Sequence, residues 1–141
     1  MCVEVINGKP PSKSNSYRII TLRSKGGIGH GSLAKTDALR AYENNFYLQC
    51  KKYRGANING LFKLFLKVYY PTNRADLDNS LKIILDCLQK CDAITNDNKC
   101  VGIVTEKYID KDNERIEFAL REIGKPVSDE LRAFVEPMFN I

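Results

Sequence analysis

Residues 61–70 show the most regular alternation of apolar and polar side chains in the chain. The apolar positions of one parity are Phe62, Leu64, Leu66, Val68 and Tyr70, whereas Lys63 and Lys67 have the opposite parity. Because successive side chains of an extended strand point to opposite faces, the pattern predicts a strand with one face in the core. The two lysines either face solvent or extend a basic surface.

Two stretches repeat their apolar residues every three or four positions, which is the spacing of one helix face. The first begins at Ser32 or Thr36 and ends near residue 51, with a stripe of Leu39, Tyr42, Phe46 and Cys50. The second has Asp78 or Asn79 as its N-cap and ends near residue 90, with a stripe of Leu81, Ile84, Leu85 and Leu88. Both stripes are predicted to pack into the core.

Four further stretches, residues 2–6, 17–23, 100–109 and 114–120, are predicted strands. Polar residues 110–113 form the turn of an expected hairpin between the last two, and a glycine-rich loop occupies residues 24–31. A short helix is expected from Ser128. Its apolar residues pack either on the body of the protein or on a partner: Leu131, Phe134, Val135 and Met138.

These elements predict a single α+β domain with a mixed β-sheet of about four to six strands packed against two main helices. The domain is expected over residues 1–123, followed by a C-terminal tail with a short helix over residues 124–141. With 43% apolar residues, no stretch of membrane-spanning length and no visible signal peptide, the expected location is cytoplasmic. The five cysteines are expected to be reduced, because neither their odd number nor their context suggests a disulfide framework.

The charge of the chain is unevenly distributed. Residues 1–70 contain 12 Lys/Arg and 3 Asp/Glu, a net charge of +9, whereas residues 71–141 contain 10 and 14, a net charge of −4. A basic half joined to a half with clustered acids suits a protein that attracts a polyanion and acts on it with a cation. Ordinary surface lysines would explain the same totals, so charge alone does not assign a function.

Asp76 and Asp78 stand where the alternating strand gives way to the second predicted helix. Side chains two residues apart in extended chain point the same way, so the two carboxylates can bind a hard divalent cation together. Lys82 lies one helical turn after Asp78, and Asp97 is a third acid in the polar turn before the next strand. We therefore predict a hydrolytic site in which Asp76, Asp78 and Asp97 bind the metal and Lys82 supplies an ammonium.

Three other interpretations fit parts of this motif. An EF-hand loop requires glycine and glutamate where this chain has Leu81 and Cys87. A phosphatase of the haloacid-dehalogenase type also uses Asp-x-Asp, but its usual Gly-Thr continuation is Asn79-Ser80 here. In the simplest alternative, the acids only cap the helix and pair with Lys82.

Cations and amides in several segments are candidates for contacts to phosphate oxygens, because these groups donate hydrogen bonds without reading base sequence. The predicted DNA-binding residues are Lys13, Asn15, Arg18, Arg23, Lys25, Arg74 and Lys107.

The motif from Arg74 to Lys82, Arg-x-Asp-x-Asp-Asn-x-x-Lys, followed by Asp97 just before a strand, resembles the RusA-type Holliday junction resolvases. The Pro-Ser-Lys-Ser-Asn segment at residues 11–15 and the order of strands and helices are similar too, so the resemblance covers about residues 3–121. Asn96 departs from the pattern, since members often have a second acid there.

This resemblance implies a homodimeric, Mg²⁺-dependent endodeoxyribonuclease, with Mn²⁺ as a substitute, that resolves four-way DNA junctions by paired symmetric nicks. By position, Asp76, Asp78 and Asp97 are the implied essential acids and Lys82 the implied essential cation. Either the loop at residues 24–31 or the C-terminal apolar stripe is expected at the dimer interface. The alternatives are a branched-DNA-binding protein that does not cleave and, less favoured, the phosphatase.

Overall fold

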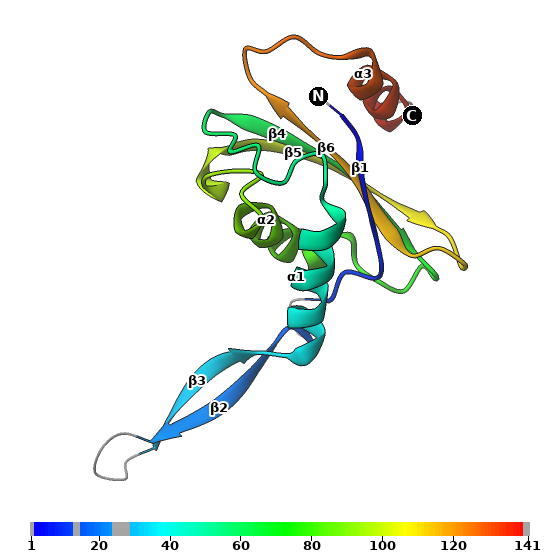
Figure 1. Ribbon diagram of the computed structural model, residues 1–141. Coiled ribbons are helices and arrows are strands. Elements are labelled where there is room, and N and C mark those ends of the chain that lie inside the picture. The colour runs from blue at the N-terminus through cyan, green and yellow to red at the C-terminus, as the bar shows by residue number, and fades with distance from the viewer. Residues whose placement is uncertain (1, 13–14, 24–28, 140–141) are drawn as a thin grey trace.

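A computed structural model describes residues 2–12, 15–23 and 29–139. Its main elements are β1 (Glu4–Asn7), β2 (Tyr17–Arg23), β3 (Gly29–Lys35), α1 (Asp37–Gln49), β4 (Phe62–Tyr70), α2 (Leu81–Lys90), β5 (Cys100–Ile109), β6 (Arg115–Glu122) and α3 (Asp129–Val135). Short 3-10 turns follow β4, α2 and α3: η2 (Leu77–Ser80), η3 (Asp97–Lys99) and η4 (Glu136–Phe139). The structure confirms the predicted α+β class (Figure 1). It contains a four-stranded mixed sheet with helices on it and a separate two-stranded sheet.

Strand β4 lies inside the larger sheet, whose order is β1-β6-β4-β5. It pairs in parallel with β5 and antiparallel with β6. The predicted apolar face is confirmed, because Phe62, Leu64, Leu66 and Val68 are fully buried and Tyr70 is 2% exposed. These side chains form the main core with α1 and α2, which cover one face of the sheet.

Helix α1 begins at Asp37 and not at Ser32. Thr36 is its N-cap, and the Thr36 hydroxyl accepts a hydrogen bond from the backbone N–H of Leu39 at 3.2 Å. Residues 29–35 form β3 instead, a strand that the sequence did not predict, because they pair along β2. The predicted stripe of α1 is buried, and the Phe46 ring stacks on Phe118 of β6 with centroids 5.9 Å apart.

Helix α2 departs from the prediction at its start and in its buried face. Asp78 and Asn79 lie within η2, and Ser80 takes the N-cap position without a capping hydrogen bond from its side chain. The side chains buried most deeply are Ile83, Ile84, Cys87 and Leu88, whereas Leu81 and Leu85 are half-buried. The buried face is rotated toward Ile83 and Cys87 because α2 packs on α1 as well as on the sheet.

Strands β5 and β6 do not form the predicted hairpin, because β4 lies between them. Their connection at residues 110–113 crosses the end of β4, where the Asp110 N–H donates to the Tyr70 carbonyl at 2.8 Å. The polar residues 110–113 correctly predicted that the chain reverses direction there. The two strands do not pair with each other, because both pair with β4.

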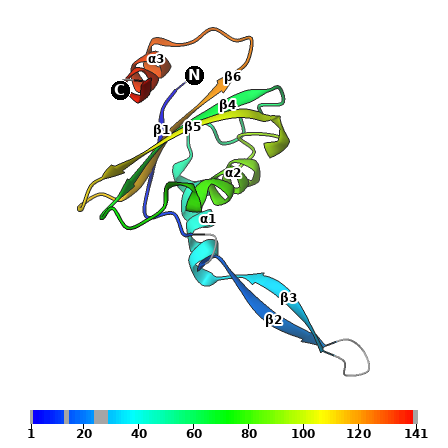
Figure 2. The same cartoon turned by 180° about the vertical axis from the view of Figure 1, so that it is seen from behind.

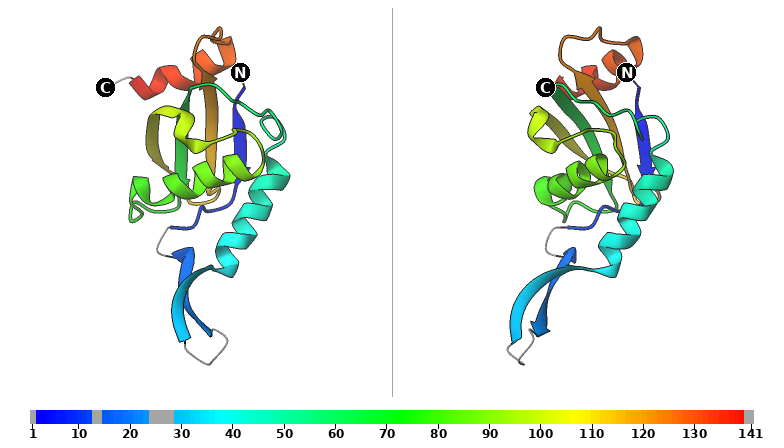
Figure 3. Two further views of the ribbon diagram at one scale, coloured as in Figure 1. Left: turned by 90° about the vertical axis from the view of Figure 1, so that its left-hand side faces the viewer. Right: turned by 60° about the vertical axis from the view of Figure 1, so that its left-hand side comes forward.

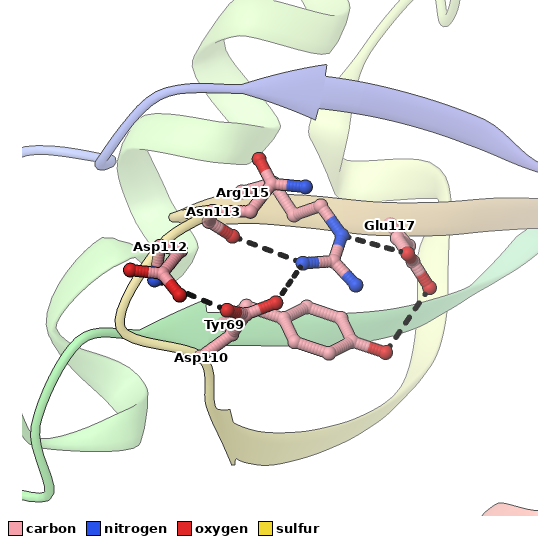
Figure 4. Close-up of polar contacts among 6 residues, drawn as sticks. All are labelled: Tyr69, Asp110, Asp112, Asn113, Arg115 and Glu117. Atoms are coloured by element: carbon pink, nitrogen blue, oxygen red, sulfur yellow. Dashed lines mark hydrogen bonds and ion pairs between the residues drawn. The ribbon is translucent and has the colours of Figure 1, made fainter.

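Arg115 holds this connection on the sheet face opposite α1 and α2 (Figure 4). Its guanidinium lies 3.6 Å from the centroid of the Tyr69 ring. It donates to the Asp110 carboxylate at 3.0 Å, the Asn113 carbonyl at 2.9 Å and the Glu117 carboxylate at 2.9 Å. The guanidinium therefore joins the ends of β4, β5 and β6.

Helix α3 packs on the four-stranded sheet of the same chain. Of the two predictions for its apolar stripe, the body of the protein and a partner, the structure shows the first. Leu131 and Phe134 are buried against Phe65 and Ala119, on the face that α1 and α2 leave open. The helix lies beside the N-terminal segment (Figure 2), where the Val3 N–H donates to the Glu130 carboxylate at 2.8 Å.

Strands β2 and β3 form an arm that extends away from the larger sheet (Figure 3). Ile19 and Leu33 face each other across the arm and are 80% and 70% exposed. Of the predicted glycine-rich loop, residues 24–28 lie outside the described residues, and residues 29–31 belong to β3.

The described residues include all five cysteines, which are free thiols. None of the helices that the structure describes is long and apolar enough to span a membrane.

The central position of β4 predicts a strong effect of Leu64→Ala. The Leu64 side chain is fully buried, so its truncation is expected to lower the free energy of unfolding by about 2–5 kcal/mol. Leu48→Ala on α1 is the matched control, because Leu48 is 65% exposed and its truncation should change stability by no more than about 0.5 kcal/mol. Urea unfolding followed by circular dichroism measures both, and equal losses would contradict the assignment of the core.

Candidate active site

All four predicted catalytic residues lie on the crossover between the parallel strands β4 and β5. Asp76 directly precedes η2, Asp78 lies within η2, Lys82 is in the first turn of α2, and Asp97 begins η3. Parallel neighbours in a sheet need such a long connection, since the chain must return to the starting edge. The fold therefore places the whole candidate site on one continuous segment.

Asp76 and Asp78 are exposed and present their carboxylates to solvent. The Asp76 backbone is extended, and its carbonyl accepts from the Asn79 N–H at 3.3 Å. Neither carboxylate has a hydrogen bond or ion pair within the part of the chain that the structure describes. The simplest alternative, in which these acids cap a helix and pair with Lys82, is therefore wrong for these two residues.

Lys82 lies between two other acids. Its ammonium is 2.6 Å from the Asp97 carboxylate and 3.0 Å from the Asp86 carboxylate. Asp86 is one turn further along the outward face of α2, and Asp97 reaches Lys82 from the far end of the crossover. Lys82 and Asp97 thus meet although 15 residues separate them.

The η3 turn that carries Asp97 is fixed by two further hydrogen bonds. The Asp97 N–H donates to the side-chain carbonyl of Gln89 on α2 at 3.1 Å. The Asn96 side chain is the N-cap of η3 and accepts from the Asn98 N–H at 3.0 Å. Asn96, the residue that departs from the sequence pattern of the resembled family, therefore has a structural role here as a cap.

The two acids raise the pKa of Lys82 above its ordinary value. The hydrogen bond to Asp97 is the largest cause, and the hydrogen bond to Asp86 is the next. Lys82 therefore remains charged around neutral pH, and the geometry suits an electrostatic role better than proton abstraction.

The carboxylates of the crossover have the right chemistry for a hard divalent cation, which prefers oxygen ligands. Asp97, however, is bonded to Lys82, and the described residues contain no group of three or more Asp, Glu, His or Cys side chains placed to hold a metal ion. The three acids therefore suit the cation as ligand types, but they are not gathered into one ligand group. Their metal-binding role stays a prediction.

The predicted DNA-binding residues are spread over the arm and the body. Asn15, Arg18 and Arg74 are exposed. Lys13 and Lys25 lie outside the described residues, and Arg23 is placed on β2 by its backbone alone. Lys107 differs from the others, because its ammonium donates to the Ala75 carbonyl at 3.0 Å.

An ion-pair cluster that the sequence did not predict lies beside this site. The Glu43 carboxylate accepts from Lys35 of β3 at 3.0 Å and also from Lys90 of α2. Burial alone would raise the pKa of Glu43, but the hydrogen bonds from Lys90 and Lys35 outweigh it and lower the pKa.

The Glu43 cluster lines a cavity of about 260 Å³ that also reaches Asp86. Lys90 and Glu43 are 47 residues apart in sequence, so no local spacing could have signalled their ion pair.

The chain is similar to known nucleases. Residues 10–121 match the sequence profile of the family Endodeoxyribonuclease RusA. The chain is also 28% identical over 119 residues to the crossover junction endodeoxyribonuclease RusA of Aquifex aeolicus (strain VF5), an alignment that covers 83% of this chain and 88% of that protein. The profile match includes the entire crossover and its four candidate residues.

The ion pairs of Lys82 predict its titration. A raised folded-state pKa means that these pairs stabilise the fold fully below the ordinary lysine pKa of about 10.4, and that this contribution is lost as pH rises through the folded-state pKa. The contribution is small, because the Lys82 side chain is 58% exposed.

In an NMR titration of the lysine side chains, we therefore expect Lys82 to lose its proton above the ordinary lysine pKa of about 10.4. Asp97→Asn should lower the pKa of Lys82, whereas Asp92→Asn, at an exposed position, should not. A wild-type Lys82 that titrates at the ordinary lysine pKa of about 10.4 would contradict the observed geometry.

Proposed function

Because the chain belongs to the RusA family of endodeoxyribonucleases, we propose that it resolves Holliday junctions by paired symmetric nicks. The observation that carries this proposal is that the match to the family covers the crossover on which Asp76, Asp78, Lys82 and Asp97 lie. The name of the Aquifex relative, a crossover junction endodeoxyribonuclease, supports the same substrate.

The proposed cofactor is Mg²⁺, with Mn²⁺ as a substitute, held by Asp76, Asp78 and Asp97. When bound, such an ion polarises a phosphate oxygen and lowers the pKa of a coordinated water. Support comes from the exposed carboxylates of Asp76 and Asp78, which have no partner among the described residues. Asp97 would have to exchange its bond to Lys82 for the ion.

Lys82 is proposed to stabilise the negative charge that develops on the scissile phosphate. The Lys82 side chain is more than half exposed, and its protonated ammonium is held on the outward face of α2 by Asp86 as well as Asp97. A fixed cation at that place acts most strongly on the transition state, where the charge is greatest.

The basic N-terminal half is proposed to bind the DNA backbone. Residues 1–70 have a net charge of +9, from 12 basic and 3 acidic residues. Arg18 on the arm and Arg74 beside the acids reach the surface and are available to phosphates. Contacts of this kind position the substrate without selecting a base sequence.

We further propose a homodimer, because one chain offers one acidic centre and resolution of a junction requires two nicks. In the C-terminal apolar stripe, Leu131 and Phe134 are already buried against the sheet of the same chain. The other expected element is the loop at residues 24–31, of which residues 29–31 belong to the arm formed by β2 and β3. We propose this arm as the interface, because its Ile19 and Leu33 are exposed.

A branched-DNA-binding protein without nuclease activity is the second candidate. It is favoured by one observation, namely that Asp97 is paired with Lys82 and not grouped with Asp76 and Asp78. The phosphatase alternative is set aside, because the family match is to an endodeoxyribonuclease.

The most direct test incubates the purified protein and Mg²⁺ with a labelled four-way junction and with linear duplex of the same length. We expect two nicks at symmetric positions of the junction, products that a ligase can reseal, and no comparable cutting of the duplex. Equal cutting of the duplex, or single unpaired nicks, would contradict the resolvase proposal. Junction binding without any nick would support the non-cleaving alternative.

Asp76→Asn, Asp78→Asn and Asp97→Asn should each lower the single-turnover rate of cleavage by at least about 100-fold, a loss typical of one group that stabilises the transition state. Junction binding measured in EDTA should be retained or become tighter, since each change removes a negative charge that repels phosphate. Asp92→Asn is the control for a neutralised surface acid and should cleave normally. A variant that cleaves at the wild-type rate would exclude that acid from the mechanism.

A further inference from the structure

Lys107 makes hydrogen bonds that set it apart from the other predicted DNA-binding residues. Its ammonium donates to the carbonyl of Ala75 at 3.0 Å and, at the longer distance of 3.5 Å, to the carbonyl of Asn73. Ala75 directly precedes Asp76, so these hydrogen bonds lie at the start of the acidic motif.

The position of Lys107 on the sheet explains how it reaches these carbonyls. Lys107 lies on the edge strand β5 and is in register with Val68 of β4. Val68 points into the core, and side chains of paired residues share a face, so Lys107 leaves the sheet on the side of α1 and α2. The chain that leaves β4 passes over this side, within reach of the lysine.

Few other hydrogen bonds fix this stretch of backbone. The other hydrogen bonds of residues 71–79 are local: the Arg74 N–H donates to the Thr72 hydroxyl at 3.4 Å, and the Asn79 N–H donates to the Asp76 carbonyl at 3.3 Å. At the end of η2 the Leu81 N–H donates to the Asp78 carbonyl. Among the described residues, Lys107 alone sends a side-chain hydrogen bond to residues 71–79 from outside that stretch. The carboxylates of Asp76 and Asp78 provide no anchor of their own.

We propose that Lys107 is a positioning residue, whose ammonium binds the backbone carbonyls of Asn73 and Ala75 and so fixes Asp76 and Asp78 for cleavage. This inference rests on the proposed nuclease function for its effect on the rate. Hydrogen bonds from a charged donor are stronger than those between neutral groups, and removal of this donor leaves the carbonyl of half-buried Ala75 without its partner. Lys107 thus acts through the backbone and not through the DNA.

Three variants test the proposal. Lys107→Met keeps most of the apolar stem and removes the ammonium, whereas Lys107→Arg keeps a cationic donor. Lys111→Met is the matched control, because Lys111 is exposed at the same end of the sheet in the connection at residues 110–113. Each variant is examined by hydrogen exchange, by junction binding in EDTA over a range of salt concentrations, and by single-turnover cleavage with Mg²⁺.

For Lys107→Met we expect the rate of amide exchange in residues 71–80 to rise by about tenfold, because this segment loses the hydrogen bonds from the Lys107 ammonium. The exchange rate in β4 should stay unchanged. The cleavage rate should fall by about 10–100-fold, the usual cost of removing a group that orients a reactive residue. Junction affinity and its salt dependence should stay at the wild-type values. Lys107→Arg should restore both the exchange and the rate, and Lys111→Met should change neither.

Unchanged exchange in residues 71–80 of Lys107→Met would overturn the proposal. So would a normal cleavage rate, or a lower junction affinity whose salt slope falls by about one, which is the signature of a missing phosphate contact. If the wild-type protein cleaves no junction, the proposed function fails, but the exchange measurement still decides whether Lys107 holds the backbone.

Discussion

The parallel pairing of β4 with β5 is the constraint on which the candidate site depends. Two parallel neighbours cannot be joined by a tight turn, so the chain has to leave the end of β4, pass over the sheet and return to the start of β5. In this protein the return consists of η2, α2 and η3, and it carries every predicted catalytic residue. The buried face of α2 fixes the crossover on the core and turns Lys82 and Asp86 outward.

The acids of this crossover form two groups, those paired with Lys82 and those without a partner among the described residues. Asp97 and Asp86 share the ammonium of Lys82, whereas Asp76 and Asp78 are exposed without a partner among the described residues. Carboxylate oxygens are the ligands that hard divalent cations prefer, so the two exposed acids have the chemistry for a cation site. In the proposed function, the basic N-terminal half offsets the repulsion between the acidic centre and the phosphates of DNA.

The sequence predicted those features that depend on neighbouring residues, such as the alternation in β4, the stripe of α1 and the acidic motif. It missed β3, whose residues 29–35 contain glycine and small polar side chains and become a strand only by pairing with β2. It also placed β5 beside β6, because a turn sequence does not reveal that another strand lies between. The bonds from Lys107 to Ala75 and from Lys90 to Glu43 were also missed, because each joins residues more than 30 positions apart in the sequence.

The central proposal is that the acids at both ends of the crossover would hold one divalent cation, although Asp97 is bonded to Lys82 in this structure. Paramagnetic broadening of amide NMR signals by Mn²⁺, without DNA, tests it most directly. The account predicts that signals of residues 75–79 and 96–98 broaden together at the same Mn²⁺ concentration and that Asp78→Asn weakens the effect in both segments. Broadening of only one segment, or broadening centred on Glu43, would contradict it.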